Sequence, residues 1–175
     1  SKTASSVFDE LGAYKTGWRM YSFTPSSTNQ RGGEFQEQNS GGVSMQLGVG
    51  YFILGKASAT INTGAGQTAV ATPTAPATIQ IKQGWNLIGN PYNFTIDWDA
   101  VLDANADLTN IGALNTNFKV WLGSYSNTQR HLLSFQGGFV FSDEPMTLKV
   151  PVERDGGLTG NGGRQEGGRY GRQED

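Results

Sequence analysis

The chain of 175 residues has no cysteine, a single histidine and few charged residues, which make up 16 % of the sequence. Without cysteine it can form no disulfide and offers no thiolate to a metal ion or a substrate. A single histidine excludes a metal site built from several imidazoles and argues against a Ser-His-Asp triad. No apolar run approaches the roughly 18 residues of a membrane helix, so membrane insertion is not expected. The net charge of −2 argues against nucleic acid as a partner, because nucleic acid requires a broad basic surface.

The sequence is instead rich in glycine and aromatic residues, with 25 Gly, 9 Phe, 6 Tyr and 4 Trp. Abundant Gly, Thr, Ser and Asn together with low charge are typical of extracellular β modules rather than of cytosolic enzymes. We therefore expect no enzymatic activity and an extracellular or cell-surface location. The length suits one ordinary domain or two small ones.

The C-terminal segment 153–175 differs in composition from the rest of the chain. It contains eight Gly and nine charged residues, and only Leu158 and Tyr170 could enter a core. Because such a segment cannot offset the entropy lost on ordering, we predict a flexible linker or tail. The alternative is an RNA-binding Gly-Arg segment, but its five acidic residues outnumber its four arginines. The folded domain is therefore expected within residues 1–152.

Residues 1–152 contain many short segments of β-branched and aromatic residues separated by Gly, Pro, Asn and Ser. This pattern predicts an all-β fold, either a β-sandwich or a partly closed barrel, with one or two short helical turns. The turns are expected at residues 7–11 and from Trp98, where Asp97 is a good N-cap. Segments 51–54 and 139–141 are apolar on both faces, which is typical of central strands. The expected strands are 18–23, 33–38, 50–54, 57–62, 77–88, 118–125, 131–134, 138–141 and 146–152.

Four segments recur in the same order, which predicts a duplicated unit. Residues 7–9, 18–21, 47–52 and 76–81 are matched by 101–103, 118–121, 135–140 and 145–150. The two pseudo-repeats therefore span about 7–81 and 101–150 and are joined by residues 82–100. The joint contains Asn90-Pro91, a dipeptide typical of a change from extended chain to turn.

The most distinctive stretch, residues 84–98, reads Gly-Trp-Asn-Leu-Ile-Gly-Asn-Pro-Tyr-Asn-Phe-Thr-Ile-Asp-Trp. Together with Trp18-Arg19 and Gly50-Tyr51-Phe52, it resembles β-rich modules of large secreted and cell-surface proteins of Bacteroidota-like bacteria. The resemblance covers roughly residues 7–152. It implies an exported chain in which the module lies beside other domains. It implies no defined ligand, because such modules are generally of unassigned function.

Period-two alternation places aromatic and basic side chains on one face of two expected strands. In 18–23 this face carries Arg19 and Tyr21, and in 118–125 it carries Lys119, Trp121 and Tyr125. Rings beside cations predict a platform that could bind a glycan or a polyanion. Cross-strand packing, with each cation laid over a ring, accounts for the same pattern.

Two other tryptophans are expected to be structural. Trp85 shares its parity with Ile79, Ile81 and Leu87, so we expect it in the core. Trp98 is expected to pack the helical turn against the sheet.

Oxygen-bearing residues at alternating positions suggest a calcium site. Asp103, Asn105 and Asp107 imitate the first half of a calcium-binding loop. However, Leu108 stands where that loop requires Gly, and Leu114 stands where it requires Glu. Calcium is therefore one hypothesis, and a solvated helix whose N-terminal acids favour the helix dipole is the other. No other cofactor is expected.

Asp97, Asp99 and Asp103 could in principle supply the carboxylate pair of a glycosidase. No second catalytic element in the sequence supports this reading. His131 follows Arg130 without a Ser or Cys signature nearby, so we expect a surface residue at a strand edge.

These observations leave two functional hypotheses. The first is a non-enzymatic structural or adhesive module of an exported multidomain bacterial protein, with neighbouring domains of the same chain or surface components as partners. The second is a carbohydrate-binding module that stacks glycans on Tyr21, Trp121 and Tyr125. Retention on polysaccharides distinguishes the two.

Overall fold

The computed structural model describes residues 2–29, 31–64, 68–110, 112–116 and 118–152. It is mostly β, with 38 % strand and 12 % helix, which confirms the predicted fold class at this level. The strands form several small antiparallel sheets, and in the described residues no sheet closes into a barrel. None of the helices in this part of the chain is long and apolar enough to cross a membrane.

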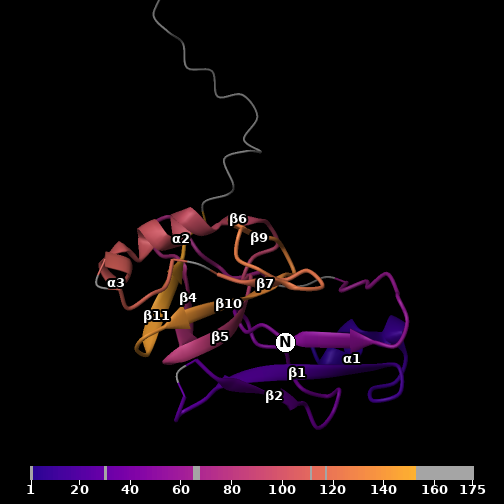
Figure 1. Ribbon diagram of the computed structural model, residues 1–175. Helices are drawn as coiled ribbons and strands as arrows, with labels where there is room; N and C mark the ends of the chain where they lie inside the picture. Colours follow the sequence, from indigo (N-terminus) through magenta and orange to yellow (C-terminus); the bar gives the residue numbers. More distant parts are fainter. Residues whose placement is uncertain (1, 30, 65–67, 111, 117, 153–175) are drawn as a thin grey trace, which may run out of the picture.

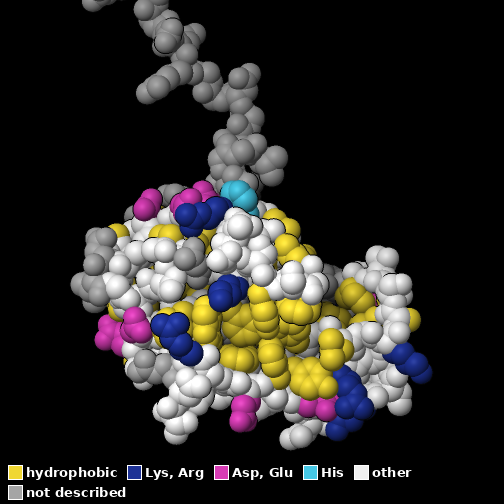
Figure 2. All heavy atoms as spheres, viewed as in Figure 1, with side chains coloured by type: hydrophobic (Ala, Val, Ile, Leu, Met, Phe, Trp, Pro, Cys, Tyr) yellow, Lys and Arg dark blue, Asp and Glu magenta, His cyan; other side chains and the backbone are white. Residues whose placement is uncertain are grey.

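The helices are short and the strands are distributed along the whole described chain (Figure 1). The helices are α1 (Ala4–Val7), α2 (Trp98–Ala104) and α3 (Ala106–Asn110), with a 3-10 turn at Asp9–Leu11. The strands are β1 (Trp18–Pro25), β2 (Gly33–Glu37), β3 (Phe52–Gly55), β4 (Ala77–Ile81), β5 (Gly84–Gly89), β6 (Ile96–Asp97), β7 (Val120–Trp121), β8 (Tyr125–Ser126), β9 (His131–Leu132), β10 (Gly137–Ser142) and β11 (Met146–Val150). In the same view, Figure 2 shows hydrophobic side chains gathered between β1 and β10.

The N-terminal part folds as a sheet of three antiparallel strands in the order β2-β1-β3. Alternation along β1 places Trp18 and Met20 on one face, where they are buried against Ala4 of α1. The helical turn expected at residues 7–11 is divided, because α1 ends at Val7 and the 3-10 turn follows it. β3 lies at the edge of its sheet and Leu54 is exposed, so the prediction of a central strand at 51–54 is wrong.

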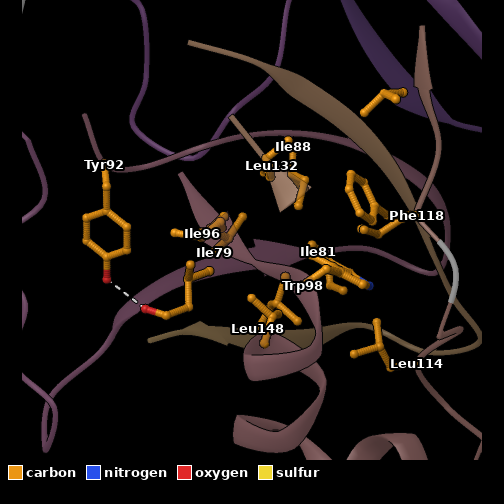
Figure 3. Packing of buried hydrophobic residues seen from close by; sticks show 14 residues of the cluster. Ile79, Ile81, Ile88, Tyr92, Ile96, Trp98, Leu114, Phe118, Leu132 and Leu148 are labelled. Atoms are coloured by element: carbon orange, nitrogen blue, oxygen red, sulfur yellow. Dashed lines mark hydrogen bonds between the residues drawn. The ribbon is translucent and has the colours of Figure 1, made fainter. Parts of the chain in front are cut away.

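The main hydrophobic core lies between the strand pairs β5–β10 and β4–β11 and helix α2. Figure 3 shows Trp98 of α2 pointing into this core toward Ile81 and Leu148. Trp98 is fully buried, as expected, and its ring centroid lies 4.7 Å from that of Phe118. The predicted N-cap is confirmed, since the Asp97 carboxylate accepts a hydrogen bond from the Asp99 N–H.

Segment 77–88, predicted as one strand, forms two strands because the chain turns between Ile81 and Gly84. Asn86 closes this turn, since its Oδ1 accepts from the Lys82 N–H and its amide donates to the Lys82 carbonyl. Gly84 follows with a φ of 93°, a conformation that L side chains rarely adopt. The consequence is that β4 pairs with β11 whereas β5 pairs with β10.

A second turn corrects the strand expected at 118–125. Leu122 donates its N–H to the Ser124 carbonyl and Gly123 has a φ of 88°, so only the two-residue strands β7 and β8 form, and they pair with each other. Residues 57–62 form no strand. The expectation for 139–141 is met in part, since Phe139 and Val140 of β10 are buried whereas Phe141 is half-buried, and β10 lies between β5 and an isolated bridge to Lys119.

The closing strands of the two expected repeats pair with each other. β4 and β11 run antiparallel with Ile79 opposite Leu148, the two residues that occupy the same place in the repeats. The duplication itself stays a prediction. The expected linker, residues 153–175, lies outside the described residues.

Candidate functional site

Aromatic side chains from both ends of the folded chain line an open cleft of about 330 Å³. We call it the aromatic cleft. It lies within the patch of hydrophobic side chains between β1 and β10 (Figure 2). Its lining is Tyr21 of β1, Phe35 of β2, Phe52 and Leu54 of β3, Trp121 of β7 and Tyr125 of β8.

Strand register explains why these side chains meet. Because Trp18 and Met20 turn into the N-terminal cluster, the odd-numbered residues of β1 face the other way. Tyr21 then lies opposite Phe52 across the β1–β3 pair. On the other wall, the short β7–β8 pair sets Trp121 opposite Tyr125.

Phe139 of β10 joins the two walls of the cleft. Its ring centroid lies 4.9 Å from that of Phe23, 5.8 Å from that of Tyr125 and 6.4 Å from that of Phe52. Phe139 is buried and does not line the cleft itself, so we call the packed rings around it the floor on which the lining rings rest. A second hollow of about 210 Å³ adjoins the cleft and is lined by Phe23, Trp85, Lys119, Tyr125 and Phe139.

The mouth of the aromatic cleft keeps its rings accessible. Trp121 is 50 % exposed and Tyr125 is 51 % exposed. Their centroids are 4.9 Å apart and their planes meet at 71°, and Phe52 meets Trp121 at 66°. The rings therefore enclose a hollow with angled walls and do not form a flat platform.

The structure brings the predicted platform residues Tyr21, Trp121 and Tyr125 together in this cleft. Tyr125 joins Trp121 through the turn between β7 and β8, and not through the uninterrupted alternation that the sequence predicted. Phe35, Phe52 and Leu54 of the lining, and Phe139 behind it, were missed by sequence reasoning. Only the register of long-range strand pairs reveals them, as Phe23↔Phe35 shows for β1 and β2.

Both predicted cations have partners of their own. Arg19 forms a salt bridge with Glu37 at 3.0 Å, and hydrogen bonding with Tyr21 together with the charge of Glu37 raises the pKa of Arg19. The Lys119 ammonium lies 4.7 Å from the ring centroid of Trp85. Neither cation lines the aromatic cleft itself.

Trp85 is half-buried and lines the second hollow, so the prediction of a core position is wrong. The turn between β4 and β5 shifts the alternation by one residue. Asn86 and Ile88 of β5 therefore turn inward, while Trp85 lies opposite Phe141 of β10 on the cleft side.

Of the predicted calcium ligands, Asp103 lies in α2 and Asp107 in α3, both exposed, whereas Asn105 is buried between the two helices as the C-cap of α2. The Asn105 amide donates to the carbonyls of Val101 (2.7 Å) and Lys149 (2.8 Å), and its Oδ1 accepts from the Lys149 N–H (3.0 Å). The described residues contain no group of three or more His, Asp or Glu that could hold a metal ion.

Two of the three aspartates considered for a glycosidase, Asp97 and Asp99, make contacts at the start of α2. Asp97 caps this helix, and Asp99 forms a salt bridge with Arg130 at 3.3 Å. His131 is half-buried on β9, opposite Asp97 of β6. Asp97, Asp99 and Asp103 therefore belong to one helix and its cap, and not to two facing walls of a cleft.

With these polar residues engaged in the fold, the aromatic cleft is an arrangement that the described residues offer to a partner. It combines a hollow shape with accessible rings that pack on the buried Phe139. No family model, curated protein or solved structure matches this chain.

Proposed function

We propose that this chain is a non-enzymatic adhesive module of an exported multidomain bacterial protein, and that it holds a partner protein in the aromatic cleft. The observation that carries the proposal is the exposure of Trp121 and Tyr125 above a floor of packed rings. Single exposed apolar residues are common, whereas contiguous apolar patches mark interaction sites. Aromatic residues also dominate the binding energy of protein interfaces.

The chemistry of the lining supports apolar side chains as the bound groups. Phe35, Phe52 and Leu54 present only hydrocarbon to the cleft, and the remaining side chains add two phenol hydroxyls and one indole N–H. A volume of about 330 Å³ is at the small end of ligand sites. We therefore expect the partner to insert aromatic or aliphatic side chains from a neighbouring domain or a surface component.

A carbohydrate-binding module is the second candidate. Tyr21, Trp121 and Tyr125 lie in one cleft, and the Arg19–Glu37 pair beside Tyr21 offers hydrogen-bonding groups to sugar hydroxyls. The angled rings and the hydrocarbon lining suit a sugar less well than coplanar rings with polar neighbours would.

Two binding assays on the full chain compare the candidates. Random peptides displayed on phage are selected against the wild-type chain, and the same chain is applied to a glycan array. Each assay is repeated with Trp121→Ala, Tyr125→Ala and the control Leu122→Ala. Leu122 is exposed in the same turn but lines neither hollow.

The adhesive proposal expects selected peptides rich in aromatic and aliphatic residues. Their affinity should fall at least about tenfold in Trp121→Ala and Tyr125→Ala, equivalent to about 1.4 kcal/mol, and should persist in Leu122→Ala. Glycan retention that is lost in the same two variants would favour the second candidate. If neither library yields binding that depends on Trp121, the cleft is not a binding site and both proposals fail.

We also propose the finer architecture, a β-sandwich built from pseudo-repeats at about 7–81 and 101–150. The antiparallel β4–β11 pair, with equivalent residues Ile79 and Leu148 opposite each other, supports a duplicated unit. The resemblance of residues 84–98 to exported bacterial modules supports the extracellular or cell-surface location.

A further inference from the structure

Phe135 occupies an unusual position at the tip of the turn between β9 and β10. The turn is closed by a hydrogen bond from the Gln136 N–H to the Leu133 carbonyl (3.1 Å) and by one from the Leu133 N–H to the Gln136 side chain (3.0 Å). Phe135 is the third residue of this turn and has a φ of 61°. Turns of this kind require a positive φ at that position, where glycine or asparagine is preferred.

A phenylalanine at this position lowers the stability of the folded chain for two reasons. Its side chain opposes the left-handed backbone conformation. Its ring is also 80 % exposed to water, so burial within the chain offsets little of that cost. A ring held outward at such a cost indicates a contact made outside the molecule.

Phe135 lines a groove of about 490 Å³ that shares no lining residue with the aromatic cleft. The groove is walled by Phe8, Met45, Tyr51 and Ile53, and the exposed Leu47 also lines it. None of the residues that line it carries a charge. A protruding apolar ring and an uncharged apolar hollow therefore lie next to each other on one surface.

Two exposed residues of the groove, Leu47 and Phe135, are related in the sequence. Leu47-Gly48-Val49-Gly50 and Phe135-Gln136-Gly137-Gly138 are matching segments of the two expected repeats. Leu47 and Phe135 thus occupy equivalent places, and both are well exposed, at 60 % and 80 %. Segment 48–50 and β10 also flank the same strand, β5, since Val49 is opposite Ile88 and Gly137 is opposite Gly89.

We infer that the occupant of this groove is a second copy of the chain, in a two-fold dimer in which each Phe135 inserts into the groove of the other copy. A two-fold contact requires a self-complementary surface, and an adjacent knob and hollow supply one. Because the groove carries no charge, two copies meet there without like-charge repulsion and without burying an unpaired charge. The contact uses none of Tyr21, Trp121 and Tyr125, so it stands independently of the proposed function.

Sedimentation velocity of the full chain over a range of concentrations tests the dimer. The wild-type chain should dimerise, and Phe135→Gly should shift the monomer–dimer midpoint at least about tenfold to higher concentration. Leu47→Ser should have the same effect, because Leu47 is exposed and lines the same groove. Leu122→Ser is the matched control, because Leu122 is 57 % exposed but does not line the groove.

Phe135→Gly also separates dimer formation from folding. Glycine accepts the positive φ, so the melting temperature of dilute monomer should be equal to that of the wild type or higher. A wild-type chain that stays monomeric up to about 1 mM would overturn the inference. A dimer that persists in both Phe135→Gly and Leu47→Ser would overturn it as well, since the interface would then lie elsewhere.

Discussion

Single polar residues of the distinctive segment 84–98 connect strands inside the molecule. Asn90 accepts a hydrogen bond from the Tyr92 N–H and donates to the Leu132 carbonyl at 2.9 Å. The Tyr92 hydroxyl donates to the Val150 carbonyl at 2.7 Å, as Figure 3 shows, and accepts from the Ala77 N–H at 3.2 Å. Buried polar groups in proteins are retained when they are hydrogen-bonded in this way. The fold therefore accounts for these residue types without a ligand.

Tyr92 gives a prediction for alkaline pH. Burial raises the pKa of Tyr92, and the hydrogen bond from Ala77 opposes this only in part. The folded state therefore keeps the Tyr92 proton to higher pH than the unfolded state does. The contribution of Tyr92 to the free energy of unfolding is fully present below about pH 10 and is lost as the pH rises through the folded pKa. Tyr92→Phe should cost about 1 kcal/mol at pH 7 through the lost hydrogen bond, and should make the alkaline fall shallower. Urea denaturation at about pH 7 and pH 10.5 measures both effects.

Tyr14 is a second tyrosine that is expected to contribute to the alkaline loss of stability. Burial also raises the pKa of Tyr14, whose hydroxyl donates to the Gln38 carbonyl in the N-terminal part. The two tyrosines should therefore share the alkaline loss of stability, and the double variant Tyr14→Phe/Tyr92→Phe should show the shallowest fall. An alkaline slope that Tyr92→Phe leaves unchanged would contradict the assignment.

At the scale of secondary-structure elements, sequence reasoning located most strands but not the turns that divide them. A strand can be predicted from composition, because β-branched and aromatic residues are enriched in strands and the signal lies within the segment itself. The turn after Ile81 depends on hydrogen bonds between the Asn86 side chain and the backbone of Lys82. No sequence pattern in this segment predicts such a contact. That one turn reversed the expected side of Trp85 and so hid part of the candidate site.

Asn105 gives a prediction at the same scale, because it ties the end of α2 to β11. Asn105→Ala would leave the Lys149 N–H and two carbonyls without this partner, at a cost of about 2–4 kcal/mol.

The loss of stability in Asn105→Ala should be the same in calcium and in chelator, because the role of Asn105 is to connect the two elements. Asp107→Asn, at an exposed position, should stay within about 0.5 kcal/mol of the wild type in chelator. A calcium-dependent gain in stability that Asp103→Asn abolishes would instead support a calcium site. Thermal unfolding of each variant provides the measurement.

At the scale of the whole molecule, the aromatic cleft lies where two hydrophobic clusters meet. The N-terminal cluster around Trp18 and Met20 is joined to the main core by the approach of residues 48–50 to β5 and by the ring contacts of Phe139. Tyr21 and Trp121 are 100 positions apart in the sequence, so only the folded chain brings them together. Strand alternation could predict which face each ring occupies, but not that the two faces converge.

This placement predicts that neighbouring rings in and behind the cleft differ in their contributions to folding stability and to binding. Phe139 is buried and contacts rings from both walls, so Phe139→Ala should lower the free energy of unfolding by about 3–4 kcal/mol. Tyr125 is half exposed at the mouth, and Tyr125→Ala should cost less than about 1 kcal/mol while removing the binding of selected peptides. Phe139→Leu, which keeps an apolar side chain on the floor, should recover most of the stability lost in Phe139→Ala. Chemical denaturation followed by tryptophan fluorescence measures these costs. If Tyr125→Ala proves as destabilising as Phe139→Ala, the mouth is as tightly packed as the floor, and no accessible surface is left there for a partner.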